Sequence, residues 1–348
     1  MPSDTLVVTK SGVQLSYIDS GAPSKSPYIT IIAIHGMCFA GRRSSSLAIF
    51  SIAFSRGIRF VTVNRRNFPG ATPFTSDEVN IIATGTDQQK SAWMQARGQE
   101  VANFIDAFIQ KYDIPAISDD GKSGGIALLG WSVGAPFACA AIASVDTLPP
   151  DARARLGSRI RTLIAHEPAP MAFGLPTPEK NWAPVSDTSI PAELRLKVFA
   201  QWVSSYFDHG DLSKRDLDLL SYILPSTSHP PTIFNMSAAE IKDTVTDGEA
   251  ASVDLPFLFY LQPQHKVNYR KAFFDPATAK LFPKMKISFL AGDQSPAWGL
   301  AGLWAVQDEA KELGNGRIHF KLIPGVNHFV HWDYPEKTVD IYVECLNA

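Results

Sequence analysis

A serine set between two glycines is the first feature of this sequence that could carry covalent chemistry. Residues 130–134 read Gly-Trp-Ser-Val-Gly, between an apolar run at 126–130 and a small-residue stretch at 135–144. A strand that turns sharply into a helix strains its central residue and exposes it, and tiny neighbours let the turn close. We therefore predict Ser132 as a nucleophile and the Val133 N–H as an oxyanion donor. The motif alone also fits an ordinary turn whose serine caps a helix.

A histidine near the end of the chain could serve as the base for that serine. A serine hydroxyl is a weak nucleophile at neutral pH, and histidine has the ordinary pKa that suits a general base. His328 follows the apolar stretch 318–325 directly, which places it on a loop at a strand end. We predict His328 as the base and expect His331 to face away or to pack.

A His-Gly pair at an earlier strand end could complete an oxyanion site. A tetrahedral oxyanion needs two converging N–H donors, and the residue after His35-Gly36 can supply one. We predict the Met37 N–H for this role, with Cys38 as its neighbour. A simple strand-ending turn is the alternative interpretation of this pair.

The elements that must position these residues form an alternating pattern. Helical periodicity covers 91–112, and a closing helix is expected over 339–346. Two short β-rich runs at the start, joined at Ser11-Gly12, predict a hairpin. Apolar runs predict strands buried on both faces at 28–34, 59–64, 126–130, 161–166, 286–292 and 318–325. The fold class is therefore α/β, with a mostly parallel central sheet and helices on both faces.

One long segment breaks this alternation. Residues 171–285 are rich in proline and contain helical patterns, one over 198–206 and a helix start over 213–220. We interpret the segment as a mainly helical insertion. The predicted domains are then a core, 1–170 with 286–348, and an inserted cap.

Composition excludes several classes of protein. The 348 residues carry 32 Lys and Arg against 34 Asp and Glu, and this net charge of −2 argues against a nucleic-acid partner. Three cysteines cannot form a disulfide framework, and no ligand spacing suggests a metal or another cofactor. Without a long apolar run or a signal-like N-terminus, we expect a cytoplasmic protein with no membrane span. A small apolar substrate is the expected partner, and a homodimer is left open.

Taken together, these motifs resemble the α/β-hydrolase fold superfamily. The resemblance is carried by His35-Gly36, Arg65–Gly70, the Gly130–Gly134 elbow and Pro324–Glu336, which span nearly the whole chain. It implies the chain order nucleophile, acid, histidine, and it makes the insertion a cap.

The acid is where the sequence departs from the superfamily pattern. Members usually carry Asp three residues after the glycine that ends the late strand, and Ser295 stands there in this chain. Asp293 lies in the same loop, whereas Glu167 directly follows the strand predicted at 161–166. Some members, haloalkane dehalogenases among them, place the acid at that earlier site, and the sequence resembles a subgroup with a His-Glu-Pro segment. We favour Glu167 over Asp293.

The resemblance and the serine imply a carboxylic ester hydrolase type of enzyme. It would cleave an ester, lactone or thioester of a medium-sized apolar molecule through an acyl-enzyme. Dehalogenases and epoxide hydrolases of this superfamily use Asp at the elbow, so serine argues against both. A lyase or cyclase acting on a natural-product intermediate without an acyl-enzyme is the alternative, followed by a non-catalytic ligand-binding member. The predicted substrate pocket comprises His35, Cys38, Trp131, Trp202 and Phe329.

Overall fold

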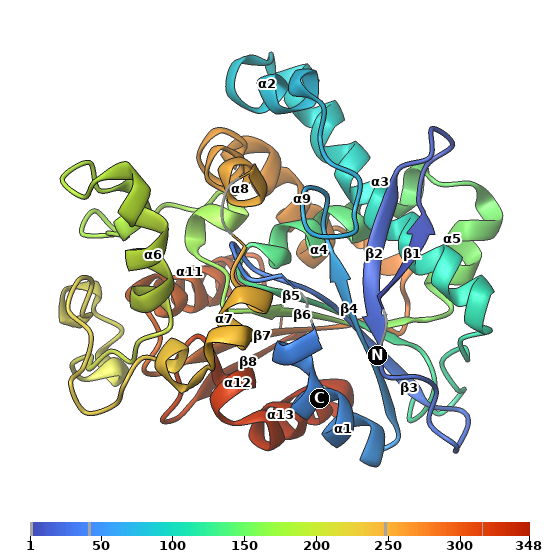
Figure 1. The fold of residues 1–348 in the computed structure, drawn as a ribbon. Coiled ribbons are helices and arrows are strands. Elements are labelled where there is room, and N and C mark those ends of the chain that lie inside the picture. Colours follow the sequence, from blue (N-terminus) through green and yellow to red (C-terminus); the bar gives the residue numbers. More distant parts are fainter. Residues whose placement is uncertain (1–2, 41–42, 247–248, 315) are drawn as a thin grey trace.

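The sheet that organises the molecule runs through its centre (Figure 1). The computed structural model describes residues 3–40, 43–246, 249–314 and 316–348. Within these ranges eight strands form one sheet in the order β1-β2-β4-β3-β5-β6-β7-β8. Their bounds are β1 Asp4–Val7, β2 Gln14–Asp19, β3 Ile29–Ile34, β4 Ile58–Asn64, β5 Ile126–Trp131, β6 Ile160–His166, β7 Lys286–Gly292 and β8 Ile318–Ile323.

The pairing of the strands confirms the predicted mostly parallel sheet. β1 pairs antiparallel with β2 across a turn in which Gly12 has φ +89°, which confirms the hairpin. β2 is also antiparallel to β4, and every later pair, from β4–β3 to β7–β8, is parallel. Since the last six strands run the same way, their carboxyl ends and the loops that follow them meet at one edge.

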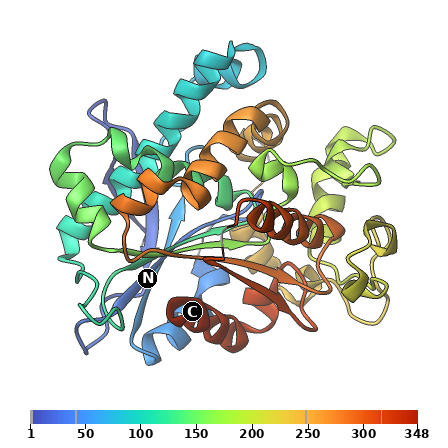
Figure 2. The ribbon, with the colours of Figure 1, turned by 180° about the vertical axis from the view of Figure 1, so that it is seen from behind.

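Helices cover both faces of this sheet. Figures 1 and 2 show α1 and α13 on one face and α3, α4 and α11 on the other. The α-helices are α1 Arg43–Ser55, α2 Ser76–Thr84, α3 Asp87–Tyr112, α4 Gly134–Ser144, α5 Pro150–Gly157, α6 Ala192–Val203, α7 Ala238–Thr244, α8 Glu249–Tyr260, α9 Gln262–Phe274, α10 Pro276–Leu281, α11 Ala297–Glu312, α12 Val330–Asp333 and α13 Pro335–Asn347. The fold is therefore the α/β class predicted from the sequence.

Helix α4, which follows the serine motif, packs closely against α3. Every residue of α4 is buried, and its small side chains let α3 approach. At Gly98 of α3, a Cβ atom would lie 2.2 Å from the Ala140 carbonyl oxygen, so only glycine fits there. This contact fixes the second half of α4 against α3.

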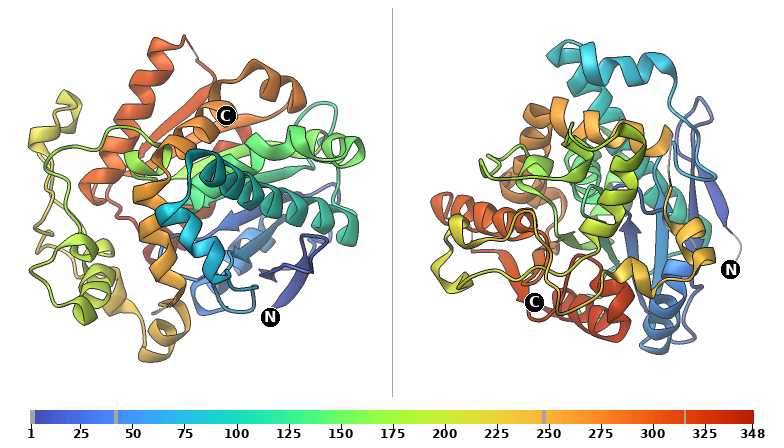
Figure 3. Two further views of the ribbon diagram at one scale, coloured as in Figure 1. Left: turned by 90° about the horizontal axis from the view of Figure 1, so that it is seen from above. Right: turned by 60° about the vertical axis from the view of Figure 1, so that its left-hand side comes forward.

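A mainly helical insertion, α6 to α10, separates β6 from β7. Figure 3 shows α6 and the chain around it at one end of the sheet, while α9 packs against α4 over the core. The helix start predicted over 213–220 is wrong, because that stretch forms short 3₁₀ turns. The Asp211 and Asp216 carboxylates accept backbone N–H groups of Ser213 and Asp218 and close these turns. The domain boundaries at 171 and 285 stay a prediction.

The length and apolar character of a helix decide whether it could span a membrane. Across the described ranges, none of them is both long enough and apolar enough to cross a bilayer.

Candidate active site

The serine motif forms the strained turn that its glycines predict. Ser132 directly follows β5 and has φ +54°, and its N–H donates to the His166 carbonyl at 2.8 Å. A Cβ at Gly130 would lie 2.4 Å from Ala135 Cα, and one at Gly134 would lie 2.2 Å from the Ile34 carbonyl oxygen. Only glycine can therefore occupy either flanking position. The turn leads into α4, so the Val133 N–H belongs to a helix start that leaves such groups without intrahelical partners.

His328 and Glu167 form a buried hydrogen bond. His328 Nδ1 lies 2.5 Å from Glu167 Oε2, and the two side chains are 2% and 0% exposed. Glu167 directly follows β6 and has φ +54°. Its other oxygen, Oε1, accepts the Ser295 hydroxyl at 2.5 Å and the Gly292 N–H. Burial alone would raise the pKa of Glu167, but the hydrogen bonds from His328 and Ser295 hold that pKa below its usual value.

Asp293, the other candidate acid, has a different partner. Its Oδ1 accepts the Gly325 N–H at 2.7 Å, and its own N–H donates to the Ile323 carbonyl. These bonds join the loop after β7 to the loop after β8. The structure thus brings Glu167, and not Asp293, into contact with the imidazole of His328.

The His35-Gly36 turn uses both ring nitrogens of its histidine internally. His35 Nδ1 donates to the Gly36 carbonyl at 2.8 Å, and its Nε2 accepts the Arg65 N–H at 3.2 Å. Burial lowers the pKa of His35, so the ring is neutral. Because both nitrogens are engaged, His35 is placed to shape the turn rather than to contact a substrate.

One cavity brings together the candidate nucleophile and both candidate oxyanion donors. We call it the front cavity, and its other walls come from the insertion and from α11. Trp298 on that wall also packs edge-on against His328, with ring centroids 4.7 Å apart. The residues that define the front cavity include Met37, Ser132, Val133, Met171, Phe199, Leu255, Leu258, Phe259 and Trp298.

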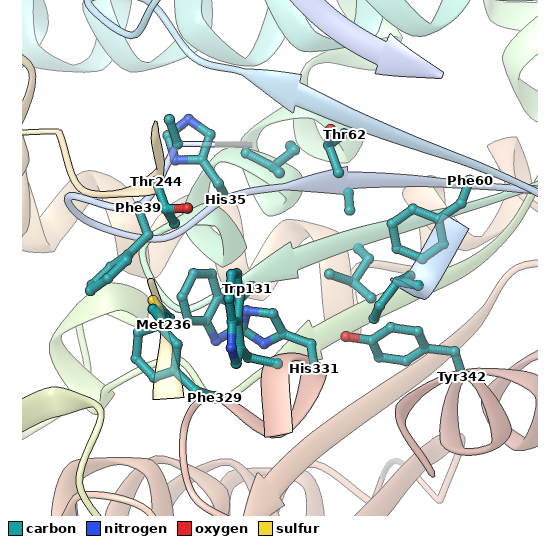
Figure 4. A pocket seen from close by; sticks show the side chains of 16 residues that line it. His35, Phe39, Phe60, Thr62, Trp131, Met236, Thr244, Phe329, His331 and Tyr342 are labelled. Atoms are coloured by element: carbon teal, nitrogen blue, oxygen red, sulfur yellow. The ribbon is translucent and has the colours of Figure 1, made fainter. Parts of the chain in front are cut away.

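Three of the predicted pocket residues lie around a different cavity. His35, Trp131 and Phe329 face a second, mostly apolar space, the rear cavity, between the sheet, α1, α12 and α13 (Figure 4). Its lining also includes Phe39, Phe60, Thr62, Met236, Thr244, His331 and Tyr342. The structure does not place these three predicted residues on the wall of the front cavity.

The remaining predicted pocket residues are packed inside the protein. Trp202 lies among aromatic rings of the insertion and donates its indole N–H to the Ile223 carbonyl at 3.0 Å. Cys38 is fully buried at φ +64°, and burial raises the pKa of its thiol. His331, which is not one of the predicted pocket residues and is expected to face away or to pack, packs edge-on against Trp131 in the rear cavity, and burial lowers its pKa to about 3.

Sequence reasoning did not identify three residues that support this site. Ser295 donates to Glu167, and Arg65 forms a buried ion pair with Asp254 at 2.7 Å. The Asp254 pairing spans 189 positions of the chain, and no local pattern predicts it. Over the residues the structure describes, His, Cys, Asp and Glu side chains form no group of three or more that could hold a metal ion.

Comparison with known proteins agrees with this architecture. A parallel sheet whose strand leads into a helix through a strained serine turn is characteristic of α/β enzymes that use this turn to present a nucleophile. Residues 31–341 match the model of the alpha/beta hydrolase family, so the chain belongs to that family.

Solved structures show the same fold at low sequence identity. A 2-hydroxy-6-oxo-6-phenylhexa-2,4-dienoate hydrolase from a Rhodococcus species has a TM-score of 0.57 at 11% identity, covering 100% of this chain and 99% of its own. A bromoperoxidase from Bacillus anthracis gives 0.51 at 13%, covering 100% of both chains. A putative aryl esterase from Burkholderia cenocepacia gives 0.51 at 16%, covering 99% and 98%. No curated protein sequence matches this chain.

Proposed function

We propose that this protein is a serine hydrolase that cleaves an ester, lactone or thioester of a medium-sized apolar molecule through an acyl-enzyme. The observation that carries the proposal is the buried hydrogen bond between His328 and Glu167, on strand-end loops beside the strained Ser132 turn. A serine, a histidine and a carboxylate in this chain order are the parts that serine-type acyl transfer requires.

The His328–Glu167 bond fixes which nitrogen can accept a proton. When Nδ1–H donates to Glu167, Nε2 is left as the basic nitrogen. His328 would take the Ser132 proton as the hydroxyl oxygen adds to the substrate carbonyl carbon, and Glu167 would stabilise the imidazolium. His328 then returns the proton to the leaving group. Water, activated by the same nitrogen, hydrolyses the acyl-enzyme and restores Ser132.

The oxyanion formed in both steps needs donors that are already in place. The Val133 N–H lies at the start of α4, where the helix dipole also favours negative charge. Met37 lines the same cavity as Ser132 and would supply the second N–H. Two such donors in a water-poor cavity supply a large part of the rate enhancement in acyl transfer.

The front cavity favours an uncharged, apolar substrate. Its wall is formed mainly by Met171, Phe199, Leu258, Phe259 and Trp298, and charged side chains are absent from its described lining. Apolar contacts of this kind bind an acyl or alkyl group and leave the carbonyl to the polar residues.

The experiment that tests the proposal compares wild type with Ser132→Ala. p-Nitrophenyl esters of increasing chain length, lactones and thioesters are supplied as substrates, and fluorophosphonate labelling is followed by mass spectrometry. We expect hydrolysis of at least one apolar substrate, a loss of at least about 10³-fold in Ser132→Ala, and label on Ser132 only.

Ser144→Ala is the matched control, because this serine is buried on α4 and its hydroxyl donates to the Gln95 carbonyl. Its activity should match wild type. If wild type shows neither hydrolysis nor labelling, the proposal fails. In that case, a non-hydrolytic conversion of a substrate without labelling of Ser132 would support a lyase or cyclase. Binding of a small molecule without any conversion would support a ligand-binding protein.

A further inference from the structure

The peptide unit between Gly36 and Met37 is held by its carbonyl oxygen. The Gly36 oxygen accepts two side-chain donors, His35 Nδ1 at 2.8 Å and Arg65 Nη2 at 3.1 Å. In a trans peptide the N–H points opposite to the carbonyl. The Met37 N–H therefore points away from Arg65, and its direction is set by whatever holds that carbonyl. Met37 itself lines the front cavity beside Ser132.

Arg65 is in turn fixed by a carboxylate from the insertion. Its Nη1 and Nη2 bond the two oxygens of Asp254 at 2.7 and 2.8 Å, which is the fork-to-fork geometry of strong arginine–carboxylate pairs. Both side chains are buried, and the guanidinium carbon lies 4.7 Å from the ring centres of Phe68 and Phe137. Arg65 also orients His35, because its backbone N–H donates to His35 Nε2.

The helix that carries Asp254 also forms part of the substrate cavity. Asp254 lies on α8, and Leu255, Leu258 and Phe259 of the same helix line the front cavity. One short helix thus contacts the space for the substrate and, through Arg65, holds the peptide that faces Ser132.

We propose that Arg65 and Asp254 are positioning residues that keep the Met37 N–H directed at the oxyanion, and that the placement of α8 is thereby a condition for turnover. The inference rests on the proposed function. Without the pair, the Gly36–Met37 peptide can rotate and turn its carbonyl oxygen, rather than its N–H, towards the developing negative charge.

Asp254→Asn tests the proposal with the least change of shape. Loss of one oxyanion donor lowers kcat about 10²–10³-fold in serine hydrolases. We expect kcat for the best ester to fall at least about 10-fold, with KM changed less than about threefold. The affinity for a boronic acid, which forms a tetrahedral adduct on Ser132, should fall in parallel. The affinity for the product acid should not change.

A double variant separates positioning from a merely structural role. Replacing a buried ion pair by apolar residues is often neutral for stability, whereas removing one partner is strongly destabilising. In Arg65→Met/Asp254→Leu we expect the Tm lost in Asp254→Asn to return while kcat stays low. If kcat recovers together with Tm, the pair is only structural and the inference is overturned.

A second ion pair serves as a control for loss of charge. Arg59 bonds Asp19 between β4 and β2, away from the His35-Gly36 turn. Asp19→Asn should lower Tm without changing kcat. Unchanged kcat and boronate affinity in Asp254→Asn, with wild type active through Ser132, would overturn this inference alone. Absence of Ser132-dependent activity in wild type would overturn the proposed function and this inference with it.

Discussion

Two neighbouring loops, after β6 and after β7, each carry a carboxylate, and the two carboxylates differ in burial and in whether they contact the imidazole. Glu167, on the first loop, is fully buried and contacts His328. Asp293, on the second, is half-buried and bonds a backbone N–H of Gly325. The second loop contributes donors instead, through Ser295 and the Gly292 N–H. The loop after β6 provides the charged carboxylate, and the loop after β7 stabilises that charge with two hydrogen-bond donors. A position near the carboxyl ends of the strands is therefore not enough to identify the acid.

Of the substitutions that test this comparison, Glu167→Gln should lower kcat the most. The amide keeps the size of the side chain but removes the charge that orients the imidazole and stabilises the imidazolium. In a serine triad such a change lowers kcat by about 10⁴-fold. We expect kcat for the best ester to fall by about 10³–10⁴-fold, measured at steady state with active sites counted by fluorophosphonate.

An intermediate effect is expected for Ser295→Ala. The variant leaves one oxygen of a buried carboxylate with a single donor, the Gly292 N–H. We expect kcat to fall about 10-fold and the free energy of unfolding at pH 7 to fall by about 1.5–3 kcal/mol, the usual value for a hydrogen bond to a charged group.

The loss of unfolding free energy in Ser295→Ala should depend on pH, and its direction follows from the lowered pKa of Glu167. Glu167 has its pKa lowered by folding, so its charge contributes stability above its ordinary pKa of 4.5, and this contribution is lost as the pH falls through the lowered value. The Ser295→Ala deficit should therefore be full at pH 7 and should shrink below about pH 4.5. Urea unfolding at both pH values measures it. A deficit that grows on acidification would contradict the assigned charge on Glu167.

The smallest effect is expected for Asp293→Asn, which is also the matched control for Glu167→Gln. The amide oxygen can still accept the Gly325 N–H, so the loops stay joined. We expect kcat within about twofold of wild type and a change in unfolding free energy below about 0.5 kcal/mol, as for most surface substitutions. If Asp293→Asn impairs kcat more than Glu167→Gln does, the roles of the two loops are reversed.

Much of the fold and part of the site follow from local patterns in the sequence. Continuous apolar runs predict the parallel strands because such strands are buried on both faces. The spacing around Ser132 predicts its turn because only glycine fits at 130 and 134. The position of His328 follows from the rule that parallel strands end at one edge.

The rest depends on contacts between distant parts of the chain. Both Glu167 and Asp293 follow strands, and only the packed loops distinguish their partners. The type of an aromatic residue predicts burial but not location, so Trp131 and Trp202 lie outside the front cavity although both are buried. Asp254 gives no local signal because its role is defined by Arg65, on a strand-end loop in another part of the sequence.

The hydroxyl of Ser295 also limits which side chains position 295 can carry. It lies 2.5 Å from Glu167 Oε1 and donates to that oxygen. A carboxylate at 295 would meet the Glu167 carboxylate at this distance, and two carboxylates in contact hold a proton between them instead of both ionising. The charge on Glu167 that stabilises an imidazolium is therefore compatible with a hydrogen-bond donor at 295 and not with a second acid there.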